Sequence, residues 1–408
     1  MNICVLTHTF PKFKKDTTAA FMKPFVEGLQ EASNNVFLLT PYIKNFENTD
    51  KKYTVIKYKY IWPDKWHKLG YSRAMKADVD LKLVNFLLLP LMLLFGSISL
   101  IRTIKKYKID VVNVHWIIPN GLMAYLASKI TKVPYVITIP GTDAYLVYKS
   151  KMFARIAKVI ANSSSGIISN SPFLLKRITD LGIKNKPTEI ISYPVDVNHL
   201  RISNSGVVSL RSKLDIANTD LIIMAVGRLV YKKGFEYLIK AMPKVIKKYP
   251  HTKLIIGGDG DLKQDLIRMT KELKIENNIL FTGNIERDEI LAFYNLADIF
   301  IAPSIVDREG NADGGPVVSY ESMACGKPQI ATDILGVSSI IKNGVNGYVV
   351  KQKNFVEISN AINKLLESGE IRKRMGIKNR QLILKSLNTK SIGLKYTDFL
   401  KNIIKNEK

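Results

Sequence analysis

Short apolar runs of strand length alternate with helical patterns along the whole of this 408-residue chain. Such an alternation is typical of parallel sheets that are covered by helices on both faces. Seven runs come before a segment rich in Ser, Asn and Asp, and six runs come after it. The runs lie at residues 2–7, 35–40, 53–60, 110–115, 134–139, 165–169 and 189–192, and then at 221–226, 253–257, 279–282, 298–302, 328–331 and 347–350. The sequence therefore predicts two similar α/β domains with a hinge near residues 196–215.

The loops that follow the predicted strands are the expected ligand site, because parallel sheets bind ligands at the carboxyl ends of their strands. We expect these loops to line one cleft. They are residues 7–20, 115–121, 140–145, 227–234, 257–261, 283–285 and 303–316.

The stretch DGGPVVSYESMACGKP, residues 313–328, predicts a glycine loop, a short helix and a stop. Pro316 suits the first turn of a helix, and Gly326 suits the left-handed residue just past its end. The start of such a helix attracts anions. Asp313 would stand at its mouth, and Glu321 would lie about a turn and a half inside the helix. Two carboxylates beside a phosphate seat fit a nucleotide-sugar; the alternative is an ordinary helix start with a solvated Asp.

A basic loop follows the apolar run LIIMAV at residues 221–226. Gly227 and Gly234 bracket this loop, which carries Arg228 and Lys233. Arg offers a forked contact and Lys a point charge. A strand, a basic loop and a helix in this order favour pyrophosphate binding.

Several motifs, which include the two stretches just described, occur in a fixed order. They are THTFPKFKKDTTAAF at 7–21, DVVNVHWIIPNG at 110–121, YVITIPGTDAY at 135–145, GRLVYKKG at 227–234, GGDG at 257–260, FTGNI at 281–285, ADIFIAPS at 297–304 and Asp-x7-Glu at 313–321. As an ordered set they resemble glycosyltransferase family 4, which has the GT-B fold. The resemblance implies two Rossmann-like parallel-sheet domains that face each other across a cleft.

The resemblance also implies how the domains are used. Residues 1–200 would bind the acceptor, residues 201–385 would bind the nucleotide-sugar, and a C-terminal helix in 386–408 would pack back toward the N-terminal domain. Family members retain the anomeric configuration of the transferred sugar. Because no nucleophile is evident here, we expect a front-face mechanism that rests on charge stabilisation of the leaving phosphate.

Individual roles follow from the same resemblance. Arg228 and Lys233 would bind the donor pyrophosphate, and Asp313 would touch the donor sugar. His115 ends a strand and Asp143 follows one, so both either face the cleft as catalytic candidates or are satisfied loop residues. The remaining expected donor contacts are Glu321 with the ribose hydroxyls, the backbone of Gly227, Gly258, Gly315, Val317 and Val318, and Asn284 and Ile285 near the base.

Four positions depart from the family pattern. Asp313 stands where the family usually has Glu, and Pro140 stands where it has His. Alanines at 19 and 20 replace a glycine of the first-strand loop, and residues 193–196 read YPVD in place of NGVD. The Pro140 change puts in question any mechanism that needs a histidine at this position.

The residue types that bind metals or redox cofactors do not show the spacing that such sites need. The two cysteines are far apart, and the five histidines show no metal-ligand spacing. Asp259 and Asp261 resemble an Asp-x-Asp metal motif, but their place after a strand favours a turn. The GGDGD segment lacks the full dinucleotide spacing. We therefore expect no metal, no cofactor and a cytoplasmic, reducing compartment.

The net charge of +26 allows two explanations. One is a compositional bias toward Lys, and the other is attraction to phosphorylated ligands and anionic membranes. Nucleic acid is not an expected partner, because no nucleic-acid-binding motif occurs.

The segment LVNFLLLPLMLLFGSISLI at 83–101, which basic residues follow, allows three interpretations. It is a buried helix, a helix that docks on the membrane surface, or a membrane-spanning helix. Spanning is disfavoured because it would split one sheet across the membrane. The expected location is the inner face of the cell membrane, as a peripheral protein.

The resemblance thus implies a retaining hexosyltransferase of surface polysaccharide or glycolipid synthesis, with a glycan or polyprenyl- or lipid-linked acceptor. The alternatives are a nucleotide-sugar epimerase or hydrolase of the same fold and a non-catalytic membrane-surface binding protein. Arg228, Lys233 and Glu321 argue against the non-catalytic alternative.

Overall fold

The computed structural model describes residues 1–13, 16, 18–44, 46–47, 52–69, 87–141, 147–148, 150–183, 185–308, 310–334 and 336–407. The chain divides into two compact units. The first unit contains Met1–Pro194 together with Thr389–Lys408, and the second contains Val195–Asn388. The first unit is therefore built from both ends of the chain.

A seven-stranded parallel sheet forms the centre of the first unit, in the order β3-β2-β1-β4-β5-β6-β7. Its strands are β1 (Asn2–Leu6), β2 (Asn35–Pro41), β3 (Thr54–Tyr58), β4 (Val111–His115), β5 (Tyr135–Ile139), β6 (Gly166–Ser169) and β7 (Thr188–Ile190). The central strands are buried on both faces, which explains why they read as continuous apolar runs.

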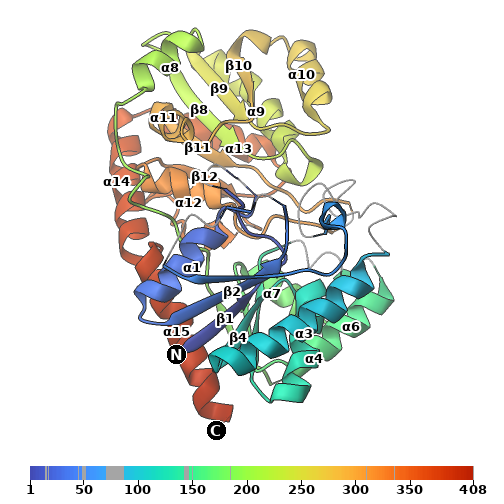
Figure 1. The fold of residues 1–408 in the computed structure, drawn as a ribbon. Coiled ribbons are helices and arrows are strands. Elements are labelled where there is room, and N and C mark those ends of the chain that lie inside the picture. The colour runs from blue at the N-terminus through green and yellow to red at the C-terminus, as the bar shows by residue number, and fades with distance from the viewer. Residues whose placement is uncertain are drawn as a thin grey trace. The chain divides into compact units, whose positions relative to one another are not determined.

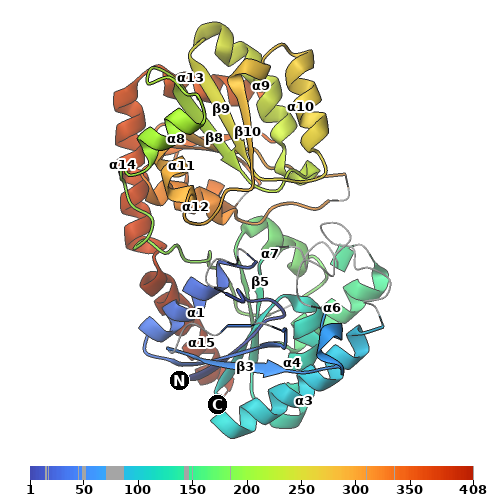
Figure 2. The same ribbon diagram turned by 45° about the horizontal axis from the view of Figure 1, so that its top comes forward.

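Helices cover both faces of this sheet (Figures 1 and 2). Four of them share one core with Cys4 and Leu6 of β1, namely α3 (Leu89–Tyr107), α4 (Leu122–Thr131), α6 (Lys151–Ser163) and α7 (Pro172–Thr179). Ile3 and Val5 alternate with those two residues and so point to the other face. There α1 (Met22–Glu31) packs against α15 (Thr389–Glu407), and the short turns η1 (Asp64–Trp66) and η3 (Ile117–Gly121) complete the unit.

The second unit repeats the design with six parallel strands in the order β10-β9-β8-β11-β12-β13. The strands are β8 (Leu221–Val226), β9 (Thr252–Gly257), β10 (Ile279–Gly283), β11 (Ile299–Ala302), β12 (Gln329–Thr332) and β13 (Gly347–Val350). The helices are α8 (Val207–Lys213), α9 (Phe235–Lys248), α10 (Lys263–Glu272), α11 (Ile290–Leu296), α12 (Val317–Ala324), α13 (Phe355–Leu366) and α14 (Gly369–Ser386), with short turns η4 (Tyr231–Lys233), η5 (Glu276–Asn278) and η6 (Gly336–Ile340).

All thirteen predicted runs are strands, with bounds that shift by a residue or two at most sites. The predicted pair of Rossmann-like parallel sheets is confirmed. In each sheet the strand order reverses at one place, between β1 and β4 in the first and between β8 and β11 in the second. A reversal of this kind opens the crevice in which doubly wound folds bind their ligands.

The ambiguous apolar segment lies mainly in α3, and its residues 83–86 fall outside the described part of the chain. Helix α3 buries Met92, Leu100 and Ile104 against the sheet, but Leu94 and Phe95 are exposed. The segment is therefore partly core and partly surface. Among the residues that the structure describes, no helix combines the length and the apolar character needed to cross a membrane.

Candidate functional site

The loops at the reversal point of the second sheet are joined by backbone hydrogen bonds. The N–H of Leu229 donates to the carbonyl of Asp259 at 2.9 Å, and the N–H of Ile305 donates to the carbonyl of Lys232 at 2.8 Å. The N–H of Gly258 donates to the carbonyl of Gly283 at 2.7 Å. The loops after β8, β9, β10 and β11 therefore form one connected floor.

Two glycines make this close joining possible. Gly258 has a φ of +124°, and a Cβ there would lie 2.0 Å from the carbonyl oxygen of Gly227. Gly234 has a φ of +67°, and a Cβ there would lie 2.1 Å from the carbonyl oxygen of Pro303. Any larger residue at either position would push two loops of the floor apart.

An ion pair crosses the reversal point. Lys233, from the loop after β8, donates to Oδ2 of Asp313, from the loop after β11, and both side chains are largely buried. Burial alone would raise the pKa of Asp313, but Lys233, Lys232 and Arg228 nearby hold it below its usual value. Asp313 is thus a carboxylate that keeps a cluster of cations in place.

Lys232 belongs to this cluster, although sequence reasoning selected only Arg228 and Lys233. Its side chain is buried, and burial lowers its pKa to about 8 against the opposing charge of Asp313. The guanidinium of Arg228 is more exposed, and partial burial lowers its pKa while Asp261 and Asp313 favour the charged form. Three cations therefore lie on one short loop beside one carboxylate.

Helix α12 has the predicted form of glycine loop, short helix and stop. It begins at Val317 directly after Pro316, so the N–H groups of Val317 and Val318 belong to the first turn, where a helix supplies no partners. It ends at Ala324, and just past that end Gly326 has a φ of +72°, followed by a hydrogen bond of 3.1 Å from the N–H of Lys327 to the carbonyl of Ser322. This is the left-handed cap that Gly326 predicts.

Glu321 lies within α12 and is oriented by the fully buried Tyr294 of α11, whose hydroxyl donates to Oε2 at 2.7 Å. Burial raises the pKa of Glu321, and the hydrogen bond from Tyr294 opposes that shift. Within the described residues Oε1 accepts no hydrogen bond, so it can receive a ligand hydroxyl. The tyrosine was not predicted, since only the fold brings residues 294 and 321 together.

The other predicted donor contacts lie on the same loops. Gly227 follows β8, Gly315 precedes α12, and Asn284 and Ile285 follow β10. Asn284 is exposed, whereas Ile285 packs where a Cβ on Gly257 would be, at 2.5 Å. The structure therefore brings every predicted residue of the second unit to one end of its sheet.

His115, a catalytic candidate, is fully buried in the first unit. Its Nδ1 lies 2.7 Å from the hydroxyl of Tyr193, and its Nε2 lies 2.9 Å from Oδ1 of Asn113. Burial, with the neighbouring His8, lowers its pKa to about 3. This environment matches the alternative interpretation, a satisfied structural histidine. Asp143, the other candidate, lies outside the described residues.

His8 follows β1, one of the two strands at the reversal point of the first sheet. It was not among the predicted site residues. Its Nδ1 lies 3.1 Å from Nδ2 of Asn120, and its ring contacts Trp116 with centroids 4.5 Å apart. Burial lowers its pKa to about 4, so it is neutral at physiological pH. Trp116 itself has a φ of +67°, an uncommon conformation for a bulky residue.

No group of three or more His, Cys, Asp or Glu within the described ranges could hold a metal ion. In the GGDGD turn, Oδ1 of Asp259 accepts the N–H of Gly260 at 2.8 Å, and Oδ2 accepts from Lys263 at 3.3 Å. Asp259 is therefore engaged in shaping the turn.

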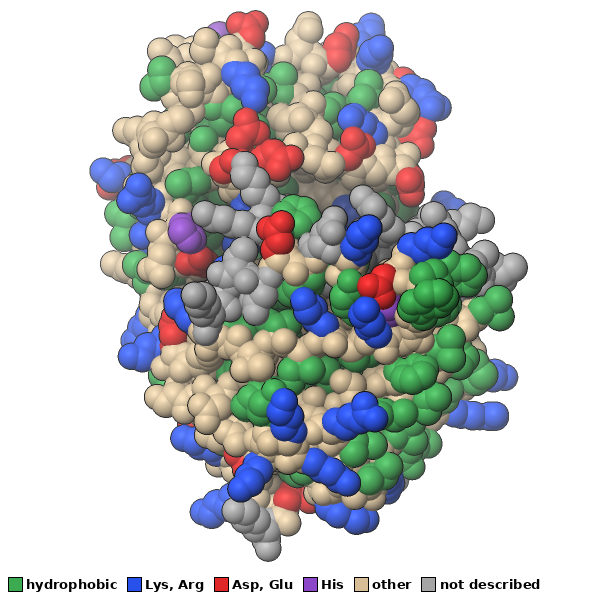
Figure 3. Space-filling model, viewed as in Figure 1, with side chains coloured by type: hydrophobic (Ala, Val, Ile, Leu, Met, Phe, Trp, Pro, Cys, Tyr) green, Lys and Arg blue, Asp and Glu red, His purple; other side chains and the backbone are tan. Residues whose placement is uncertain are grey.

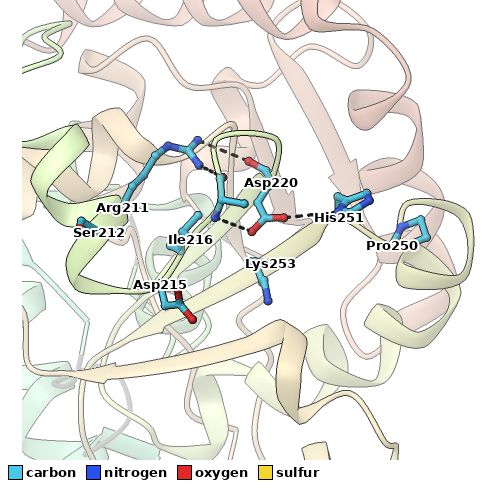
Figure 4. A pocket seen from close by; sticks show the side chains of 9 residues that line it. Arg211, Ser212, Asp215, Ile216, Asp220, Pro250, His251 and Lys253 are labelled. Atoms are coloured by element: carbon cyan, nitrogen blue, oxygen red, sulfur yellow. Dashed lines mark hydrogen bonds and ion pairs between the residues drawn. The ribbon is translucent and has the colours of Figure 1, made fainter.

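A separate polar pocket of about 420 Å³ lies at the opposite end of the second sheet, where β8 and β9 begin (Figure 4). Arg211 donates to the carbonyl of Ala217 at 2.6 Å, and the carboxylate of Asp220 accepts the N–H of Ala217 at 3.0 Å. These polar groups hold the pocket wall together. The pocket is distinct from the basic loop and lies away from the reversal point.

Comparisons with known proteins agree with this geometry. The protein-family model "Glycosyl transferases group 1" matches residues 209–382, and "Glycosyltransferase Family 4" matches residues 25–199. The two matches together account for most of both units.

Individual relatives are distant. An uncharacterized glycosyltransferase of Methanocaldococcus jannaschii is 28% identical over 272 residues, which is 64% of this chain and 66% of the relative. Alpha-monoglucosyldiacylglycerol synthase of Acholeplasma laidlawii is 25% identical over 336 residues, or 79% of this chain and 78% of that protein. The crystal structure of Anabaena HepE in complex with UDP has a TM-score of 0.74 at 19% identity and covers 98% of this chain and 100% of its own.

Proposed function

The chain belongs to glycosyltransferase family 4 and has the GT-B fold, and we propose that it transfers a hexose from a nucleotide-sugar to a glycan or lipid-linked acceptor with retention of anomeric configuration. The sugar, the base and the acceptor stay open.

One observation carries this proposal. Arg228, Lys232 and Lys233 gather on the loop after β8, at the reversal point of the second sheet, beside the start of α12. Three cations and the N–H groups in the first turn of a helix form a seat for a diphosphate. Asp313 and Glu321 flank that seat with carboxylates that suit sugar and ribose hydroxyls. A donor with both phosphates and hydroxyls fits this combination.

The same groups supply the chemistry. As the bond between the anomeric carbon and the phosphate oxygen breaks, negative charge develops on the diphosphate, where the cations and helix N–H groups stabilise it. The leaving phosphate oxygen accepts the proton of the acceptor hydroxyl, which attacks the same face of the sugar. No protein nucleophile takes part, and we propose that no divalent ion is needed because the charge is already matched by side chains.

The acceptor and the location are inferred from less specific features. A similar protein makes alpha-monoglucosyldiacylglycerol, a glycolipid, as its name states. The N-terminal 200 residues here carry 28 basic and 13 acidic side chains. Both features support a lipid-linked acceptor that the enzyme meets at the inner face of the cell membrane.

Donor turnover tests the proposal directly. Purified protein is offered UDP-, GDP- and ADP-hexoses, each with and without extracts of membrane lipid and glycan as acceptor. Acceptor-dependent consumption of one donor is the expected result. Consumption without acceptor would indicate a hydrolase, isomerised donor an epimerase, and binding without turnover a non-catalytic protein.

Two variants then test the site. Arg228→Ala and Lys233→Ala should each lower kcat/KM by about 10²–10³, the usual cost of losing one charge-stabilising donor. Lys253→Ala is the matched control, because this lysine donates to the carbonyl of Asn277 at 2.8 Å, away from the basic loop. Wild-type rates in both loop variants would refute the diphosphate assignment.

A further inference from the structure

The outer surface of α3, α4 and α6 in the first unit exposes apolar side chains at helical spacing. Helix α3 exposes Leu91, Leu94 and Phe95, helix α4 exposes Leu126 and Ile130, and helix α6 exposes Met152 and Val159. The largest exposed fractions on the three helices are 55% for Leu94, 63% for Ile130 and 59% for Met152. We call this surface the three-helix face.

The three-helix face is continuous. Helix α4 packs against both α3 and α6, and Figure 3 shows hydrophobic side chains gathered over the part of the first unit where these helices lie in Figure 1. A shallow groove of about 230 Å³ runs between α4 and α6, lined by Leu122, Tyr125, Arg155, Ile156, Val159 and Ile160. Large continuous apolar patches on a protein surface usually mark an interaction site.

The charge of this face identifies the partner. The three helices contain seven basic residues and no acidic residue, the basic ones being Arg102, Lys105, Lys106, Lys129, Lys151, Arg155 and Lys158. The whole chain has 35 acidic residues for its 61 basic ones. Composition alone therefore does not account for three adjacent helices without one acidic side chain.

We infer that the three-helix face docks on an anionic lipid bilayer. Apolar side chains that lie between basic ones match the two layers of such a surface, since the leucines and isoleucines enter the acyl boundary while Lys and Arg meet the phosphates. A second protein copy is a poorer fit, because two such faces would bring like charges together. Docking would bring the enzyme to the proposed lipid-linked acceptor, and in this respect the inference rests on the proposed function. Binding to the bilayer itself does not require turnover.

Vesicle sedimentation without donor or acceptor tests the inference independently of the proposed function. Vesicles of phosphatidylcholine alone are compared with vesicles that also contain phosphatidylglycerol. The protein should bind the anionic vesicles reversibly. Raised salt should weaken this binding without abolishing it, because salt screens charge over ~10 Å at 0.1 M but leaves the apolar contacts intact.

Two sets of variants locate the surface. Leu94→Ser, Ile130→Ser and Val159→Ser together remove one apolar side chain from each helix. The neutralising set is Lys105→Gln, Lys106→Gln and Arg155→Gln. Each basic residue near an anionic surface contributes a factor of about five, so the neutralised variant should bind about 10²-fold more weakly. The serine variant should lose binding to a similar extent.

Matched controls come from the second unit. Val356→Ser, Ile377→Ser and Leu384→Ser change side chains that are 43 to 45% exposed. Lys240→Gln, Lys247→Gln and Lys271→Gln remove the same charge. Both controls should bind like wild type, and all variants should keep the wild-type melting temperature because the changed residues are exposed.

Three outcomes would overturn the inference. One is no binding to anionic vesicles at low salt, and another is an equal loss in the control variants. The third is a dimer in sedimentation equilibrium that the serine variant dissolves, since the face would then be an interface between copies. If vesicles bind as expected but no donor is turned over, the docking stands and the proposed transferase activity fails.

Discussion

His115 should stay neutral far below the pH at which a histidine normally takes up a proton. The side-chain oxygen Oδ1 of Asn113 can only accept a hydrogen bond, so Nε2 of His115 carries the proton and donates to it. Nδ1 then accepts from the hydroxyl of Tyr193. A second proton would place a charge in a fully buried site, and burial accordingly lowers the pKa to about 3.

The size of the effect follows from that pKa. At pH 5 a group with a pKa of about 3 is ~1% protonated, whereas one at 6.5 is ~97% protonated. Because the unfolded chain then binds a proton that the folded chain rejects, stability is lost as pH falls below 6.5. Between pH 7 and pH 5 the loss due to His115 is about 2 kcal/mol, at ~1.4 kcal/mol for each pH unit below 6.5.

Urea denaturation at pH 7 and pH 5 measures this loss, with tryptophan fluorescence as the signal. All three tryptophans, Trp62, Trp66 and Trp116, belong to the first unit, so the signal reports that unit alone. His115→Gln should lose ~2 kcal/mol less than wild type between the two pH values. His251→Gln, at an exposed histidine of the second unit, is the control and should behave like wild type.

An equal loss in wild type and His115→Gln would refute the reasoning. A direct check is the NMR titration of histidine labelled with ¹³C at Cε1, in which the His115 signal should stay unchanged from pH 8 to pH 5. A midpoint near 6.5 would instead restore His115 as a candidate general acid or base.

Three further predictions concern the second unit. Gly258→Ala should destabilise the protein by ~3 kcal/mol and abolish donor binding, because its Cβ would lie 2.0 Å from the carbonyl oxygen of Gly227; Gly369→Ala, where the nearest atom is 3.6 Å away, is the thermal-denaturation control. Asp313→Asn should lower kcat yet bind the nucleoside diphosphate product several-fold more tightly in calorimetry, since Lys233 is released to the phosphates and a like charge is removed; weaker product binding would contradict this. Activity should persist in excess EDTA, and complete loss that Mn²⁺ or Mg²⁺ restores would revive a metal role for the GGDGD turn.

The sheets were predictable because buried parallel strands leave a local signal. A run such as LIIMAV at residues 221–226 is apolar throughout, since both of its faces are covered. The role of Gly326 as a left-handed helix cap was also predictable, because such a cap depends on one residue and its immediate neighbours.

The parts of the site that could not be predicted from the sequence depend on contacts between residues far apart in the chain. Lys232 and Lys233 are the same residue type, so the sequence alone does not distinguish them. Burial of Lys232 depends on the loop after β11, where the N–H of Ile305 donates to the backbone carbonyl of Lys232. The pairing of Glu321 with Tyr294 and that of His8 with Asn120 also join residues from different elements. No local pattern separates such residues from their neighbours.

The packing of α15 on α1 sets the order in which the molecule can be completed during synthesis. The two helices meet backbone to backbone, since a Cβ on Gly393 would lie 1.8 Å from the carbonyl oxygen of Gly28, and Asn34 donates to the hydroxyl of Thr397 at 2.7 Å. Helix α15 is thus half of an interface whose other half, α1, leaves the ribosome long before it. The second unit can finish folding while the first still waits for its final helix, and a chain released early would keep α1 with its apolar face uncovered.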